Sequence, residues 1–131
     1  MKKHGVVSVI LRDGKMLVIR RGPEVVFPGY WAAPSGRMEP GESQSQTVVR
    51  EVMEELGLEV EALAKVWECP TDDGLYTLHW WTVRLSSTDV RLAPGEVSEA
   101  RWVTPEEFFA LEPTFVGDRE FFSDVLPKLI R

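Results

Sequence analysis

The strongest constraint on the fold is residues 36–58, a 23-residue segment that contains the start and stop signals of one amphipathic helix. Ser43 is a favoured N-cap residue, and Gln46 three residues later completes a capping-box pattern. Gly57 is the residue type that most often follows the end of a helix. We therefore predict a helix that ends at Leu56 and packs one side against a core. Its expected core-facing side chains are Val48, Val49, Val52, Met53 and Leu56.

The same helix carries an unusual concentration of carboxylates. Three of them, spaced i, i+3 and i+4, project from one arc: Glu51, Glu54 and Glu55. Such a triplet is often only a solvated face, but Glu42 and Arg50 extend it with charges of both signs. Clustered carboxylates repel one another unless a cation lies between them, and hard divalent cations prefer oxygen ligands. The glycine-containing approach 34–36 also allows backbone carbonyls to come close. The pattern predicts a metal site.

Length and charge narrow the classes of protein. A chain of 131 residues predicts a single domain, 1–131, with its own core. The net charge of −6 argues against nucleic acid or an anionic membrane as a partner. Cys69 is the only cysteine, which favours a reducing compartment, so we expect a cytoplasmic protein. The apolar run Val6–Leu11 is too short to span a membrane, and no signal-peptide cleavage site follows it.

The remaining chain predicts strands with a few helices. The turn signal Asp13-Gly14 joins two β-branched runs into a hairpin, and Pro127 is expected to bend or end the last helix. The expected strands are Val6–Leu11, Lys15–Arg20, Trp31–Ala33, Leu58–Glu68, Leu75–Leu85 and Ala100–Val103. The further helices are expected from Thr104, as N-cap, to Leu111 and from Asp118 to Leu126. This composition indicates an α/β or α+β fold around one sheet.

The segment from Gly36 to Leu58 also resembles a known motif. Gly36, five residues, Glu42, seven residues and then Arg50-Glu51-Val52-x-Glu54-Glu55-x-Gly57-Leu58 resembles the Nudix box, G-x5-E-x7-R-E-U-x-E-E-x-G-U. Every fixed position of that motif is met, so the signal is strong. The W-x-x-P-x-G approach before the box and the E-x-R-W sequence at 99–102 are also similar to small Nudix hydrolases.

The resemblance implies a fold, a reaction and a cofactor. The fold is an α/β/α sandwich with a mixed sheet, and the reaction is hydrolysis of a diphosphate linkage in a nucleoside diphosphate joined to another group. Mg²⁺ or Mn²⁺ is the implied cofactor. The implied side-chain ligands are Glu51, Glu54, Glu55 and Glu96, with the carbonyl of Ser35 as a main-chain ligand. Arg50 is implied to pair with Glu42 and hold the loop against the helix.

The proton acceptor for the attacking water is open among three carboxylates. Glu51 lies in the helix, and Glu96 lies six residues before Trp102, where MutT-type members carry a metal-binding or basic glutamate. Glu99 is a third candidate and also suits a strand-end salt bridge. We prefer Glu51 as ligand or base, with Glu96 assisting.

Substrate contacts are expected outside the box. Arg20, Arg21 and Arg37 suit phosphate groups, although a solvated strand end explains the first two equally well. Plausible stacking partners for a base are Phe27, Tyr30, Trp31, Tyr76, Trp80 and Trp81. Alternation along the strand predicts that one of Trp80 and Trp81 lies in the core and the other at the cleft. The pattern does not decide which of the two faces the cleft. Our substrate-binding candidates are Arg20, Arg21, Arg37, Tyr76 and Trp81.

Three weaker signals bear on the substrate. The chain has no asparagine to read an oxidised base as MutT-type enzymes do, and Asp118 is a possible substitute. Tyr76, 18 residues past the box, tilts towards dinucleoside polyphosphates, and Gly74 in place of proline tilts away from ADP-ribose. We expect a small nucleotide as substrate, favouring a nucleoside triphosphate or a dinucleoside polyphosphate. The alternative is a non-catalytic nucleotide-binding module, which usually has a damaged box. Monomer and homodimer both remain open.

Overall fold

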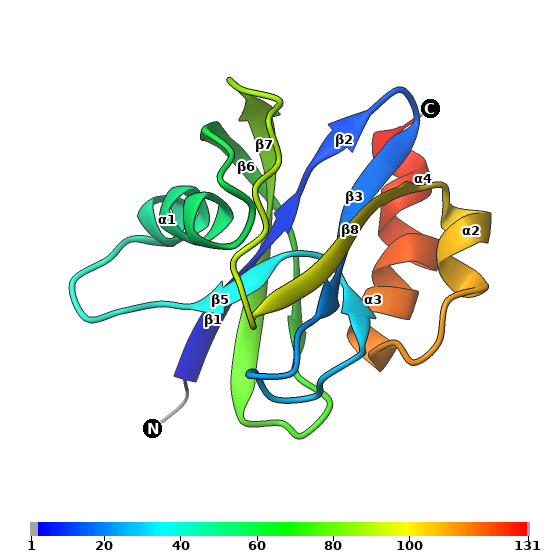
Figure 1. Cartoon of the computed structure of the whole chain (residues 1–131), viewed down its shortest axis with the longest axis horizontal. Helices are drawn as coiled ribbons and strands as arrows, with labels where there is room; N and C mark the ends of the chain where they lie inside the picture. The colour runs from blue at the N-terminus through cyan, green and yellow to red at the C-terminus, as the bar shows by residue number, and fades with distance from the viewer. Residues whose placement is uncertain (1–2, 131) are drawn as a thin grey trace.

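The computed structural model describes residues 3–130, which form two sheets with helices on either side (Figure 1). The strands are β1 (Lys3–Val9), β2 (Leu11–Arg12), β3 (Lys15–Arg21), β4 (Trp31–Ala32), β5 (Ser35–Arg37), β6 (Val60–Pro70), β7 (Tyr76–Leu85) and β8 (Val97–Val103). The helices are α1 (Gln44–Leu56), α2 (Pro105–Phe109), α3 (Val116–Glu120), the π-helical turn η1 (Phe121–Val125) and α4 (Leu126–Leu129). Helix α1 lies on one side of the strands and the C-terminal helices lie on the other. The predicted α/β/α class is confirmed.

The strands divide into two sheets rather than the single sheet expected. One sheet is mixed and has the order β5-β1-β7-β6, with β1 parallel to β7. The other has the order β2-β3-β4, and β8 pairs with β3. The predicted turn is present, because Asp13 and Gly14 both have the positive φ of a tight hairpin, 53° and 76°. Before the turn, however, only the short β2 pairs with β3, through Leu11 with Met16 and Arg12 with Lys15. The chain passes from one sheet to the other at the buried Ile10. The continuous apolar run Val6–Leu11 does not reveal this division into two strands.

The core consists of two apolar clusters. Under the C-terminal helices, Trp80 stacks on Phe121 with ring centroids 4.2 Å apart, and Phe108 stacks on Phe122 at 3.9 Å. Each of these fully buried side chains contributes about 1.5–3 kcal/mol of burial free energy. Beneath α1, the buried side chains are Ile10, Leu17, Ile19, Val52, Leu56, Leu58, Val60 and Val97.

The expected apolar stripe of α1 is only partly correct. Val48, Val52 and Leu56 are buried, as predicted. Val49 and Met53 are instead 40% and 44% exposed. The helix contacts the sheet with a narrower arc than the five apolar side chains cover. Spacing therefore identified the buried face but overestimated its width.

The C-terminal helix extends further than the sequence predicts. Capping at Thr104 is as expected, and α3, η1 and α4 follow one another from Val116 to Leu129. Pro127 does not end the helix. The Leu126 N–H donates to the Phe121 carbonyl in a π-type bond, and Pro127 falls in the first turn of α4, where a missing N–H is tolerated.

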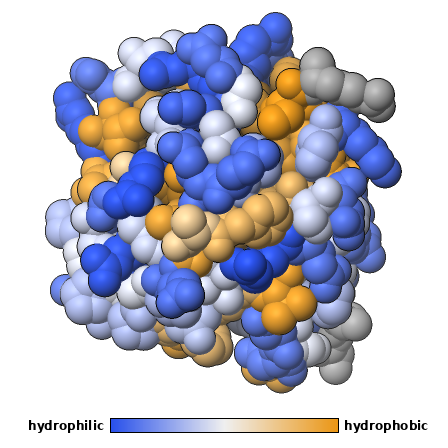
Figure 2. All heavy atoms as spheres, turned by 90° about the vertical axis from the view of Figure 1, so that its right-hand side faces the viewer, coloured by the Kyte–Doolittle hydropathy of each residue, from blue (hydrophilic) through white to orange (hydrophobic). Residues whose placement is uncertain are grey.

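The surface over these helices is mainly hydrophilic, with apolar side chains in separate small patches (Figure 2). Among the described residues, none of the helices combines the length and hydrophobicity that crossing a bilayer requires.

Candidate active site

Helix α1 is fixed at both ends by the caps that its sequence predicts. Ser43 Oγ accepts the Gln46 N–H, and Gln46 Oε1 accepts the Ser43 N–H at 2.8 Å. At the other end, Gly57 has φ 66° and donates its N–H to the Met53 carbonyl. A helix N-terminus capped in this way holds the loop before it in one orientation. The residues of the box are therefore presented by a rigid element.

Arg50 ties the box loop to the helix. Its Nε and Nη2 bond the two carboxylate oxygens of Glu42 at 2.6 and 2.8 Å, and Nη2 also donates to the Arg37 carbonyl. Its Nη1 donates to Glu51 at 2.8 Å and to Glu54 at 3.1 Å. Hydrogen bonds from Arg50 lower the pKa of Glu42 to about 2, so that carboxyl stays ionised. The predicted Glu42–Arg50 pair is present in bidentate form, the strong form of this interaction.

Gly36, the first residue of the box, is required by the packing of Glu51. A β-carbon on Gly36 would lie 2.0 Å from Cδ of Glu51, closer than any real contact. Burial raises the pKa of Glu51, although Arg50 opposes the rise. Burial also raises the pKa of Glu55 to about 8, and the neighbouring charge of Glu51 adds to the rise. Oε1 of Glu55 is buried and has no hydrogen-bond partner within residues 3–130.

These carboxylates suit a divalent cation. Glu96 faces the same cleft, and its charge contributes to the raised pKa of both Glu51 and Glu55. Ser35 lines this cleft beside them. Mutually repelling carboxylates with an unpartnered buried oxygen form an oxygen-only donor set, which fits Mg²⁺ or Mn²⁺. Within residues 3–130, no three acidic, histidine or cysteine side chains already converge at metal-binding geometry.

Glu54 differs from the other predicted ligands. Its side chain is 56% exposed and bonds Arg50, and it does not line the cleft. The structure therefore brings together four of the five predicted donors: Ser35, Glu51, Glu55 and Glu96.

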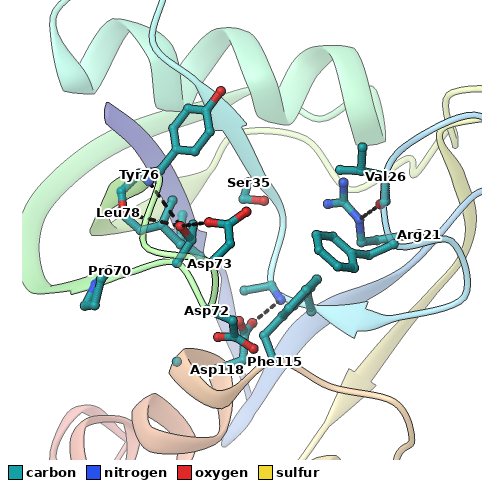
Figure 3. Close-up of a pocket in the computed structure, with 16 residues that line it drawn as sticks. Arg21, Val26, Ser35, Pro70, Asp72, Asp73, Tyr76, Leu78, Phe115 and Asp118 are labelled. Atoms are coloured by element: carbon teal, nitrogen blue, oxygen red, sulfur yellow. Dashed lines mark hydrogen bonds between the residues drawn. The ribbon is translucent and has the colours of Figure 1, made fainter. Parts of the chain in front are cut away.

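The acidic region, lined by Glu51, Glu55 and Glu96, adjoins a largely apolar cavity of about 170 Å³. The two share lining residues such as Arg21, Ser35 and Tyr76, and Figure 3 shows the lining of the cavity. The cavity walls are largely aliphatic and aromatic: Val7, Val26, Phe27, Ala32, Ala33, Tyr76, Leu78 and Phe115. Phe27, Tyr30 and Phe115 pack together with ring centroids 4.6–5.4 Å apart. Phe27 has φ 54°, an uncommon conformation for a bulky residue.

Asp118 is a buried carboxyl group of this cavity, which other polar residues also line: Arg21, Ser35, Thr71, Asp72 and Asp73. It is 6% exposed, and its Oδ2 accepts the Ala33 N–H at 2.9 Å. Burial raises the pKa of Asp118 to about 7. Arg21 lines both the cavity and the acidic region, and its Nε donates to the Val26 carbonyl at 2.7 Å. Burial lowers the pKa of Arg21, whereas the charges of Glu55 and Asp118 raise it. Arg21 therefore lies between the acidic region and the apolar cavity.

The structure brings three of the five predicted substrate-binding residues to the cleft. Arg21, Arg37 and Tyr76 line it, and a hydrogen bond to Tyr76 raises the pKa of Arg37. Arg20 is exposed and does not line it, because side chains alternate along β3 and its neighbour takes the cleft side.

Neither candidate tryptophan of β7 lines the cleft. Trp80 shares a face with Tyr76 and Leu78, but at its position Phe121 covers the strand. Trp81 projects to the other face, where its Nε1 donates to Gln44 at the start of α1. The two tryptophans do lie on opposite faces and Trp80 is in the core, but the prediction that the other lines the cleft is wrong, because alternation does not show where along the strand the cleft ends.

Several residues that line the cleft were not predicted from the sequence. Glu24, Phe115 and the turn 71–73 all line the cleft. Each lies in a connection next to the end of a strand or helix, where binding residues concentrate. Their position in loops is therefore the sequence feature that could have identified them. Glu99, the third candidate base, instead forms a salt bridge with Arg101 at 2.8 Å within β8.

The fold and the site together define a class of domain: an α/β/α sandwich whose capped helix presents buried carboxylates to a cleft. A family model described as the NUDIX domain matches residues 2–125. The chain therefore belongs to the Nudix family, and it has the box and the fold of a Nudix hydrolase.

Individual relatives agree with this assignment. The chain is 35% identical over 104 residues to the CTP pyrophosphohydrolase of Escherichia coli, covering 78% of this chain and 76% of that one. It is 32% identical to the NAD-capped RNA hydrolase NudC of Deinococcus radiodurans, covering 89% of this chain but only 41% of that longer protein. The crystal structure of the MutT protein from Methanosarcina mazei superposes with a TM-score of 0.83 at 24% identity, covering 99% and 96% of the two chains.

Proposed function

We propose that this protein hydrolyses a diphosphate linkage in a small nucleotide with the help of Mg²⁺ or Mn²⁺. The buried, unpartnered Oε1 of Glu55 beside Glu51 is the observation that carries the proposal, because a cation would satisfy it. Glu51, Glu55, Glu96 and the Ser35 carbonyl would hold the ion, with Glu54 joining them if it leaves Arg50. A bound divalent cation offsets the charge of the diphosphate and of the transition state.

The protein's own groups bind the substrate and move the proton. Arg21 and Arg37 would contact phosphate oxygens from the cleft walls. Water attacks one phosphorus, the bond from that phosphorus to the bridging oxygen breaks, and the other phosphate leaves with its oxygen. Glu51, or Glu96 assisting it, accepts the proton that the water loses. Arg50 keeps the box loop and Glu51 in place throughout.

The shape of the cleft favours a nucleotide with one base in the apolar cavity. A cavity of about 150 Å³ accepts one benzene ring, so the observed 170 Å³ suits a single aromatic ring system. Asp118 would hydrogen bond the base, and the phosphates would reach the acidic region past Arg21. A nucleoside triphosphate fits this arrangement best, and the relative named as a CTP pyrophosphohydrolase supports it. A dinucleoside polyphosphate is the second candidate, supported by Tyr76 at the cleft.

A nucleotide panel with Mg²⁺ tests the proposal. The panel contains normal and oxidised dNTPs, dinucleoside polyphosphates, ADP-ribose and nucleotide sugars, and phosphate-containing products are measured with and without EDTA. We expect turnover of at least one triphosphate or dinucleoside polyphosphate, abolished by EDTA. Nucleotide binding without turnover of any compound would instead identify a non-catalytic module.

A further inference from the structure

The segment Gly22–Glu24 runs directly beside the loop that carries Glu96. The Gly22 N–H donates to the Glu96 carbonyl at 2.8 Å, and the Glu24 N–H donates to the Gly95 carbonyl at 2.9 Å. These bonds continue the pairing of β3 with β8 past a shift in register between Arg20 and Arg21. Irregular pairing of this kind commonly redirects a side chain next to an active site.

Two glycines permit an unusually close approach here. A β-carbon on Gly22 would lie 2.4 Å from the Gly95 carbonyl oxygen. A β-carbon on Gly95, which has φ 78°, would lie 2.3 Å from Cδ of Glu24 and 2.4 Å from its Oε2. The carboxylate of Glu24 therefore rests on the backbone of Gly95, one residue before Glu96. Glu24 and Glu96 also line the same acidic region.

Glu96 depends on this backbone for its placement. Its side chain is exposed, and its own hydrogen bonds are made by the main chain, to Gly22 and to the Ala93 carbonyl. The backbone conformation of a loop determines the direction of its side chains. A displacement of about 1 Å at a reacting centre can lower the rate roughly a hundredfold. A contact that holds the turn at Gly95 in place therefore also determines where the Glu96 side chain lies in the cleft.

We propose that Glu24 is a positioning residue for Glu96, an inference that rests on the function proposed above. The Glu24 side chain fills the space over Gly95 and holds the turn so that the Glu96 carboxylate faces Glu51 and Glu55. It acts by packing rather than by its charge. The required shape is retained by glutamine and lost in alanine.

A double-mutant cycle tests this role, with Mn²⁺ affinity and kcat as separate readouts. Glu24→Ala should weaken Mn²⁺ binding several-fold and lower kcat by roughly tenfold, with KM little changed, whereas Glu24→Gln should retain both. In an E96Q background, Glu24→Ala should have no further effect on either quantity. Additive losses in the cycle would overturn the proposal, and so would equal damage from Glu24→Gln and Glu24→Ala. Glu59→Ala, an exposed glutamate on the loop after α1, is the control and should change neither readout.

Gly95→Ala offers an independent test, because its new β-carbon must displace the Glu24 carboxylate or the turn. It should reproduce the Mn²⁺ defect of Glu24→Ala. Gly14→Ala is the matched control: it has a similar φ of 76°, with nothing within 4 Å of the added carbon. Equal Mn²⁺ affinity in these two variants would contradict the proposal. Because Mn²⁺ binding is measured without substrate, failure of the nucleotide panel would refute the proposed activity and still leave this test decisive.

Discussion

Asp118→Asn is the sharpest available test of the electrostatics of the apolar cavity. The substitution keeps the size of the side chain and an oxygen that can accept the Ala33 N–H. It removes the ability to ionise and replaces the other carboxyl oxygen with an amide NH2 group. Burial raises the pKa of Asp118 from 3.8 to about 7, although the Ala33 N–H and Arg21 oppose the rise.

The sign and size of the effect follow from this shift. The folded protein keeps a proton on Asp118 that the unfolded chain releases above pH 3.8, so folding stability falls as the pH rises from about 4 to 7. Each pKa unit corresponds to 1.36 kcal/mol, so ionised Asp118 costs the folded state about 4 kcal/mol at pH 7 and above. The asparagine variant lacks this cost. It should be more stable than the wild type by as much as ~4 kcal/mol at pH 8 and by almost nothing near pH 4.

Urea unfolding at several pH values between 4 and 8, in EDTA to exclude bound metal, measures this difference. The free energies of unfolding of the two proteins should diverge by about 1.4 kcal/mol per pH unit over most of that interval. Asp89→Asn, at an exposed loop position, is the control and should leave the pH profile unchanged. A difference between wild type and Asp118→Asn that does not vary with pH would refute the reasoning, because Asp118 would then not titrate on folding.

Three further outcomes test the acidic region. Glu55→Gln should lower turnover at least a hundredfold and abolish the thermal stabilisation by Mn²⁺, measured by steady-state assay and thermal melts, because it replaces the buried carboxylate with a neutral amide. Near-normal turnover would contradict the metal site. Gly36→Ala should impair Mn²⁺ binding measured by calorimetry, since its β-carbon would lie 2.0 Å from Cδ of Glu51, whereas Gly14→Ala should bind normally. Arg50→Lys should lower the free energy of urea unfolding by about 1–3 kcal/mol, because lysine cannot form the bidentate bond to Glu42; an unchanged midpoint would show that this bond adds no stability.

Local signals explain what the sequence predicted well. The capped helix α1 follows from Ser43, Gln46 and Gly57, each of which acts within a few residues of its own position. The Glu42–Arg50 bond can also be predicted from the sequence, because the two residues are close in sequence and one of them lies on the helix. The box therefore predicts most of its own geometry.

What the sequence could not predict depends on contacts between distant segments. The placement of Trp81 against Gln44 is decided by the packing of α1 on β7. The approach of Glu24 to Gly95 joins positions 71 residues apart through two glycines that look like ordinary turn residues. The exposure of Met53 depends on how wide a face of α1 the sheet covers. Periodicity specifies a face, but it does not specify which partner covers it or how far.

The parallel pairing of β1 with β7 has a consequence for how the chain folds during synthesis. Its register joins Lys3 to Tyr76 and Val9 to Thr82, so the two strands are 73 residues apart in sequence. At about 5–20 residues per second, a ribosome needs roughly 4–15 s to make that interval. Until then β1, most of which is buried in the finished protein, lacks the neighbour that covers one of its edges. Strand β1, an interior strand of the mixed sheet, is thus made well before its partner β7 and is paired late, which leaves it exposed to aggregation in the nascent chain.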